Sequence, residues 1–242
     1  MRIVLLTNGA SHGWRMLEEL RRSDVPLAAI IVEKEAPPPV PPLRDCLKQL
    51  GYQTTASVLC RAVGEAVYPN FPAFSYRRFA RVVRRVIDFN SPETQAILAA
   101  LKPDLILLGG SRILKRPILE CARLAVLNAH PGLLPAYRGV DVIPWALHNG
   151  DPVGVSVHVV DSGIDTGAVI MTRELPVARG ESIPELKIKA EALAAVMMSQ
   201  VVRQVLATGR IDPLPVTTPK GPLYRQMPTD IRAALDQKLS AR

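Results

Sequence analysis

Three polar side chains, Asn128, His130 and Asp165, have the types and spacing that acid–base chemistry needs. Asn128 and His130 end the apolar stretch LAVLNAH, which predicts a buried strand over 124–130. Residues two apart in a strand point to the same side, so an amide and an imidazole project together. Asp165 lies in a Gly-Ile-Asp-Thr-Gly turn after another predicted strand. From there its carboxylate can fix the tautomer of the imidazole and favour the charged form.

Each of these residues, taken singly, also has a structural explanation. A histidine at a strand end is more often a satisfied structural residue than a catalyst. Asn128 can cap a turn, and Asp165 can form an Asx-turn with Gly167. His158, inside an alternating strand, is expected to pack or to face solvent. The combination of the three residues within one motif is what favours a site.

Apolar runs that alternate with helical segments must position these side chains. They predict an α/β fold, a Rossmann-like open and mostly parallel twisted sheet with helices on both faces. Such a sheet binds ligands beyond the carboxyl ends of its strands, which is where Asn128 and His130 lie. The predicted strands cover 2–7, 27–32, 104–110, 124–130, 154–161 and about 168–175.

Helix signals separate these strands. Ser91-Pro92 predicts a helix start, and Ser182 with Glu185 forms a capping box for a long helix that Gly209 ends. Further helices are expected over 13–22, 43–50 and 143–148 and from about Thr229, with a turn and short helix around 112–122. We divide the chain into a catalytic domain over 1–210 and a short extension over 211–242 that forms no separate domain.

Composition and charge narrow the class of protein. No run of about eighteen apolar residues occurs, so we expect no membrane span. The three cysteines, Cys46, Cys60 and Cys121, match neither a disulfide framework nor a zinc site, which favours a cytoplasmic protein without a metal. The net charge is +8, with a basic, amphipathic helix predicted between Arg77 and Arg85. That face is either solvated or attracts an anionic substrate or RNA, but aromatic residues for base stacking are scarce.

The stretch that holds the three polar residues resembles the signature of the formyltransferases that use 10-formyltetrahydrofolate. Asn-Ala-His-Pro-Gly-Leu-Leu-Pro is followed by Arg138-Gly139 and then by the Asp165 turn. The elements around Arg112-Ile113-Leu114 and Trp145-Ala146-Leu147 also agree. The similarity runs from about 103 to 186. The family includes glycinamide ribonucleotide, methionyl-tRNA and sugar N-formyltransferases, and a stand-alone enzyme of the sugar type is most similar.

The resemblance implies a transferase that moves the formyl group of 10-formyltetrahydrofolate, its co-substrate, to a small-molecule amine such as a nucleotide-linked amino sugar. It implies that His130 stabilises an oxyanion or handles a proton, that Asn128 donates to the same oxyanion, and that Asp165 orients and charges His130. The implied folate-binding residues are Gly110, Arg112, Ile113, Leu114, Ser162, Gly163 and Ile164.

Other readings stay open. The first turn, Gly9-Ala10-Ser11-His12-Gly13, departs from the phosphate loop of the purine-pathway enzymes. Only about thirty residues follow the long helix, where methionyl-tRNA formyltransferases carry a barrel domain. Both departures disfavour those acceptors. A folate- or RNA-binding protein and an enzyme that hydrolyses formyl-folate are the remaining alternatives, and the sequence leaves open whether the chain forms a homodimer.

Overall fold

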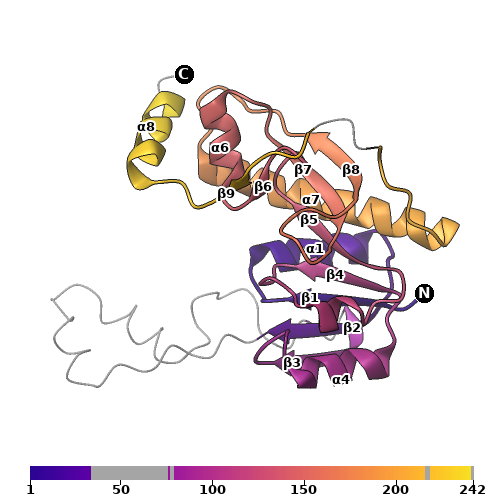
Figure 1. Cartoon of the computed structure of the whole chain (residues 1–242). Coiled ribbons are helices and arrows are strands. Elements are labelled where there is room, and N and C mark those ends of the chain that lie inside the picture. Colours follow the sequence, from indigo (N-terminus) through magenta and orange to yellow (C-terminus); the bar gives the residue numbers. More distant parts are fainter. Residues whose placement is uncertain (34–75, 77–78, 216–218, 241–242) are drawn as a thin grey trace, which may run out of the picture.

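The computed structural model describes residues 1–33, 76, 79–215 and 219–240. They form a seven-stranded sheet of order β3-β2-β1-β4-β5-β7-β8 (Figure 1). The first five strands are parallel, whereas β7 runs antiparallel to β5 and β8 antiparallel to β7. This arrangement confirms the predicted open, mostly parallel α/β fold. The strands are β1 (Ile3–Thr7), β2 (Leu27–Glu33), β3 (Ala80–Val86), β4 (Leu105–Gly109), β5 (Ala125–His130), β7 (Gly154–Val159) and β8 (Val169–Glu174).

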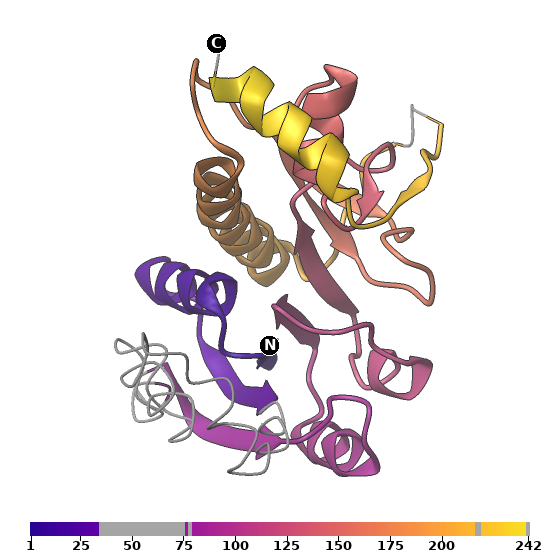
Figure 2. The ribbon, with the colours of Figure 1, turned by 90° about the vertical axis from the view of Figure 1, so that its left-hand side faces the viewer.

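Helices cover both faces of the sheet, as Figures 1 and 2 show. On one face, α1 (Ser11–Arg22) packs against the long α7 (Ile183–Thr208). On the other lie α4 (Pro92–Leu101) and the short α5 (Arg116–Leu119). Two hydrophobic clusters, one on each face, fill the space between sheet and helices. Central strands such as β1 and β4 are therefore buried along their whole length, which explains their continuous apolar sequences.

The predicted helix ends are confirmed. The Ser91 hydroxyl accepts the amide of Thr94 at the start of α4. At the start of α7, Ser182 and Glu185 form the reciprocal capping box. Gly209 ends α7 with a left-handed backbone, φ +75°. Two more helices, α6 (Val142–Asn149) and α8 (Thr229–Ser240), pack together near the C-terminus. No helix in the described ranges is both long and apolar enough to cross a membrane.

One predicted element differs in type. The basic helix predicted between Arg77 and Arg85 is wrong, because Ala80–Val86 is the edge strand β3, paired in parallel with β2. Its β-branched valines suit a strand that is covered on one side, and the helix-like spacing of apolar residues is coincidental. Arg77, Arg78 and the predicted helix over 43–50 lie outside the described residues. The turn and short helix expected around 112–122 are confirmed by the four residues of α5.

A small second sheet was not predicted. It pairs β6 (Arg138–Gly139) in parallel with β9 (Leu223–Tyr224), which brings the C-terminal part of the chain to the loop that follows β5. Two-residue strands carry no hydrophobic periodicity, so the sequence contains no signal for them.

The pairing register places the antiparallel hairpin beside the sheet's carboxyl edge. Leu108, near the end of β4, is level with Asn128, and β5 continues two residues further to His130. Strand β7 pairs only with residues 127–130 of β5. The hairpin β7–β8 therefore extends past the edge at which β4 ends and forms a wall there.

Candidate active site

A cleft of about 580 Å³ lies at the carboxyl edge of the sheet. Residues from the loop after β4, the end of β5, the loop after β7, helix α7 and strand β9 line it. Asn128, His130 and Asp165 are all among the lining residues. The structure thus brings together the three residues that the sequence singled out, from segments about thirty-five residues apart.

Asn128 is paired across the sheet with His158, and this pair is hydrogen-bonded through its side chains. The amide Nδ2 of Asn128 lies 3.3 Å from Nε2 of His158. The other ring nitrogen of His158, Nδ1, lies 2.8 Å from the carbonyl oxygen of Val159. Because a carbonyl only accepts, Nδ1 carries the proton and Nε2 accepts from Asn128. One N–H of the Asn128 amide is engaged in this way, and the second is available to a ligand.

The His130 imidazole has an acceptor at each ring nitrogen. Its Nε2 donates to the carbonyl oxygen of Tyr137 at 2.8 Å, and its Nδ1 lies 3.5 Å from Oδ2 of Asp165. The residue is only 4% exposed. Burial lowers the pKa of His130 below its ordinary value, although the nearby Asp165 carboxylate and the Tyr137 carbonyl act in the opposite direction. A neutral ring that donates from Nε2 therefore leaves the lone pair of Nδ1 facing the carboxylate.

The Asp165 carboxylate lies between the two histidines. Its Oδ2 accepts the amide of Gly139 at 2.9 Å, and its Oδ1 is 3.6 Å from Nε2 of His158. Asp165 itself has a left-handed backbone, φ +50°. The loop around it is closed by Asp161, which accepts from the Gly163 amide and from the Thr166 hydroxyl. The predicted Asx-turn is thus made by Asp161, and the carboxylate of Asp165 is left to face the site.

His158 is the site residue that sequence reasoning missed. It is 2% exposed, and burial lowers its pKa. Ser156, two residues earlier on the same face, donates to the Gly132 carbonyl at 2.7 Å and accepts the Leu134 amide at 2.9 Å. It thereby holds the loop after His130. The sequence did contain a signal for His158. The predicted strands over 124–130 and 154–161 each carry two polar residues at alternate positions, Asn128 and His130 in one and Ser156 and His158 in the other.

The residues expected to bind folate line the cleft, with one exception. Gly110, Arg112, Ile113, Leu114, Gly163 and Ile164 line it, whereas Ser162 is exposed and is not among the lining residues in the described part of the chain. Ile113 is 69% exposed and Ile164 39%, so two large apolar side chains stand open to solvent at the cleft. The guanidinium of Arg112 lies 3.0 Å from the buried carboxylate of Glu33.

Titratable residues also line the cleft, among them His12, Glu191 and Arg225. The Glu191 carboxylate accepts from the Ser11 hydroxyl and from Nε of Arg15 at 3.2 Å. Burial lowers the pKa of His12, although Glu191 acts against this shift. The cleft is therefore lined by exposed apolar side chains and by charged ones, in addition to Asn128, His130 and Asp165.

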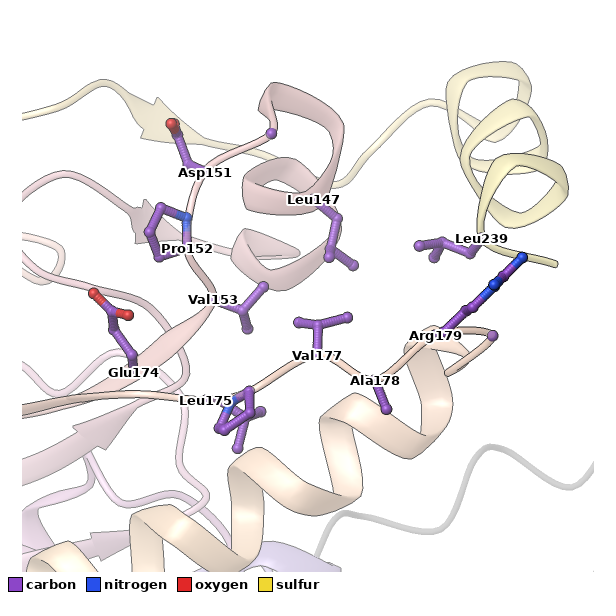
Figure 3. Close-up of a pocket in the computed structure, with 13 residues that line it drawn as sticks. Leu147, Asp151, Pro152, Val153, Glu174, Leu175, Val177, Ala178, Arg179 and Leu239 are labelled. Atoms are coloured by element: carbon purple, nitrogen blue, oxygen red, sulfur yellow. The ribbon is translucent and has the colours of Figure 1, made fainter. Parts of the chain in front are cut away.

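A larger cavity, about 890 Å³, lies elsewhere, between α6, α8 and the segment before α7. Figure 3 shows apolar side chains of Leu147, Val177 and Leu239 around it, with Glu174 and Arg179 at opposite ends. None of its lining residues belongs to the polar cluster described above. Volume alone would select this cavity, but the arrangement of titratable groups selects the cleft at the sheet edge.

Comparison with known proteins gives a family for this geometry. The model of the formyl transferase family matches residues 60–202. A methionyl-tRNA formyltransferase of Chlorobium chlorochromatii is 36% identical over 126 residues, which are 52% of this chain and 40% of that protein. The chain therefore spans less than half the length of this curated relative.

Solved structures share the fold at low sequence identity. Glycinamide ribonucleotide transformylase 1 from Symbiobacterium toebii superimposes with a TM-score of 0.61 at 22% identity, covering 89% of this chain and 94% of its own. The formyltransferase PseJ from Anoxybacillus kamchatkensis, in complex with a UDP-linked formamido sugar and tetrahydrofolate, gives 0.56 at 18% identity. That match covers 99% of this chain and 100% of PseJ.

Proposed function

The chain belongs to the formyl transferase family, and we propose that it transfers the formyl group of 10-formyltetrahydrofolate to the amino group of a small molecule. The reaction takes place in the cleft at the carboxyl edge of the sheet. The observation that carries this proposal is the convergence of Asn128, His130 and Asp165 in that cleft, whose lining also includes apolar and charged side chains.

The apolar lining residues of the cleft fit the pterin ring of the folate. A pterin is a flat ring with hydrogen-bonding edges, and it needs apolar side chains on its faces together with backbone groups at its rim. The exposed side chains of Ile113 and Ile164 supply the first, and the loop segments around Gly110 and Gly163 supply the second. The half-exposed guanidinium of Arg112 offers a cation to the carboxylates of the folate tail.

We assign to Asn128 the stabilisation of the negative charge that develops in the transition state. Transfer of a formyl group between two nitrogens places charge on the formyl oxygen, and a preorganised N–H lowers the barrier most effectively in a partly buried site. His158 holds one N–H of the Asn128 amide and so fixes which way the amide points. The second N–H of the Asn128 amide is then oriented to donate to the oxyanion.

We assign proton transfer to His130 and Asp165. The neutral His130 ring has a free lone pair at Nδ1, and a proton accepted there forms an imidazolium between two acceptors. The Asp165 carboxylate stabilises that cation at 3.5 Å. The pair can therefore take the proton that the attacking amine loses and return it to N10 of tetrahydrofolate as the bond between N10 and the formyl carbon breaks.

We assign binding of the acceptor amine to the charged lining residues of the cleft. Glu191 offers a carboxylate to an amine or a hydroxyl, and the exposed Arg225 offers a cation to an anionic group such as a phosphate. An amino sugar linked to a nucleotide carries all three kinds of group. The PseJ structure, whose whole length matches this chain, contains a product of that class and tetrahydrofolate.

Methionyl-tRNA is the second candidate acceptor. Seven curated relatives with 32–36% identity are methionyl-tRNA formyltransferases. Glycinamide ribonucleotide is a third, named in the solved structure from Symbiobacterium toebii.

One assay tests the proposal and separates the acceptors. The protein is incubated with 10-formyltetrahydrofolate and, in turn, a panel of nucleotide-linked amino sugars, glycinamide ribonucleotide and charged methionyl-tRNA, and release of tetrahydrofolate is followed. We expect turnover with an amino sugar only. Turnover with methionyl-tRNA alone would transfer the assignment to that acceptor. Neither binding nor consumption of formyl-folate with any amine would overturn the proposed function.

A further inference from the structure

Both members of the His130–Asp165 pair are anchored on the backbone of one short segment, residues 137–139. The carbonyl of Tyr137 accepts from Nε2 of His130 at 2.8 Å. The amide of Gly139 donates to Oδ2 of Asp165 at 2.9 Å. The relative placement of imidazole and carboxylate therefore depends on where this segment lies.

The segment is held by the C-terminal part of the chain. Arg138 and Gly139 pair with Leu223 and Tyr224 as strands β6 and β9. The amide of Val140 donates to the carbonyl of Tyr224 at 3.2 Å. Gly139 has φ +99°, and a Cβ there would clash with that same carbonyl, so the two backbones approach as closely as a glycine permits.

The Tyr224 side chain strengthens this attachment. Its ring stacks on the ring of Tyr137, with centroids 5.1 Å apart and planes at 7°. The Asn149 amide donates to both hydroxyls, at 3.0 Å to Tyr137 and 3.1 Å to Tyr224. Trp145 adds a bond from Nε1 to the Arg225 carbonyl at 2.8 Å. One aromatic side chain thus links β9 to the residue whose carbonyl holds His130.

We propose that Tyr224 is a positioning residue: through the stacked Tyr137 ring and the β6–β9 pairing, it fixes the distance between the His130 ring and the Asp165 carboxylate. Tyr224 acts on the chemistry through backbone groups more than eighty residues earlier in the chain. Residues around β9, within the predicted extension over 211–242, are then part of the active site. This inference rests on the proposed function for its kinetic consequence, and on the geometry alone for its effect on His130.

Two readouts test the proposal, of which the first needs no substrate. The ring-nitrogen NMR signals of His130 are identified in isotope-labelled protein by their loss in the His130→Gln variant, and they report tautomer and titration. In Tyr224→Ala we expect mixed tautomers and a titration closer to that of a free histidine. In Tyr224→Phe, which keeps the stacked ring, we expect the wild-type signals. The control is Leu235→Ala, which removes a buried side chain of α8 that packs in the cluster of Ile183 and Met227.

The second readout is the kinetics of formyl transfer. A misplacement of about 1 Å in a catalytic group costs about 10²-fold in rate, so we expect kcat of Tyr224→Ala to fall by up to that factor. We expect the KM for formyl-folate to change little and Tyr224→Phe to restore kcat. A lesion in substrate binding would instead raise KM and leave kcat.

Each outcome decides the proposal. Unchanged His130 signals and unchanged kcat in folded Tyr224→Ala would overturn it, as would equal changes in Leu235→Ala. If Tyr224→Ala does not fold, Tyr224→Leu, which keeps an apolar side chain but no ring, takes its place. If neither folds, β9 serves the fold as a whole and the positioning role is rejected. Altered His130 signals in a protein without formyl transfer would reject the proposed function and leave the positioning role intact.

Discussion

His158 lies directly across the sheet from Asn128, with its Nε2 3.3 Å from the Asn128 amide nitrogen. The buried imidazole accepts from the amide because its own proton is bonded to the Val159 carbonyl. The residue that fixes the proposed oxyanion donor therefore comes from the neighbouring strand.

We expect His158→Ala to lower kcat by about 10–10²-fold, because the freed Asn128 amide loses its orientation. His158→Gln keeps an acceptor oxygen, so its kcat is expected to lie between those of His158→Ala and the wild type. Steady-state kinetics with the acceptor identified in the panel measure both. Equal activities of His158→Ala and the wild type would show that His158 only packs.

Asp165→Asn is expected to lower kcat by about 10²–10³-fold, the loss typical of one electrostatic contact to a developing charge. The amide oxygen of an asparagine can still accept from Gly139, so the loop and the fold stay intact, which circular dichroism and urea unfolding check. Glu174→Gln, at the rim of the larger cavity, is the matched control for loss of a carboxylate. A wild-type rate in Asp165→Asn would exclude the proposed proton role.

His130 and Asp165 are expected to act as a unit. His130→Asn alone is predicted to reduce kcat about as much as Asp165→Asn, and the double variant to lose little more than either, because groups that share one function are not additive. A double-mutant cycle on kcat measures the coupling. Independent, multiplying losses would mean that the two side chains serve different steps.

The site and most of the fold followed from the sequence because their signals are local. Continuous apolar runs gave the buried strands, and Ser91, Ser182 and Gly209 gave helix ends. Asn128 and His130 share a face through the two-residue period of a strand. The sequence does not show which strands pair with one another. The register that sets His158 opposite Asn128 depends on which strands become neighbours, and nothing within either strand encodes that.

Two other differences have the same origin. The arginine-rich stretch is a strand because β2 offers it an edge to pair with, and tertiary pairing outweighs a helix-like spacing of apolar residues. Tyr224 joins the site through a two-residue ladder to Gly139, for which no periodic pattern exists. Long-range contacts of this kind appear only in the folded chain.

Asn90 holds the loop expected to bind folate from outside the cleft. Its amide donates to the Ile113 carbonyl at 3.0 Å, and its oxygen accepts the Lys115 amide at 2.6 Å. Two such bonds contribute about 1 kcal/mol each, so we expect Asn90→Ala to raise the KM for formyl-folate by about tenfold or more with little change in kcat. Asn90→Asp keeps the acceptor and is expected to have a smaller effect. A change confined to kcat would contradict this role.

Acidic pH is expected to destabilise the fold through the buried His130 and His158 and the partly buried His12. Burial lowers the pKa of His12, His130 and His158. Between each lowered pKa and the unfolded value of about 6.5, the unfolded chain binds more protons than the folded one. The free energy of unfolding therefore rises with pH up to about 6.5, then levels off, and it falls on acidification below that pH.

Urea midpoints at about pH 7.5 and about pH 5.5 measure this dependence, with at most about 1.4 kcal/mol per pH unit from each histidine. His158→Gln removes one of the three groups and is expected to flatten the dependence. A midpoint that stayed constant, or rose, on acidification would contradict burial of the neutral rings.

Strand β5 is hydrogen-bonded on both sides, to β4 in parallel and to β7 in antiparallel. Its amides are thus among those that only a large opening of the molecule exposes, and we expect them to be among the last to exchange with deuterium. Asn128 and His130 share that slow unit with His158, whereas Asp165 and Gly139 lie outside the seven-stranded sheet, Asp165 in a loop and Gly139 in the small β6–β9 sheet, in segments that can open separately. Local opening would then separate the carboxylate from an imidazole that stays in place, so the acid–base pair can be lost while the cleft survives.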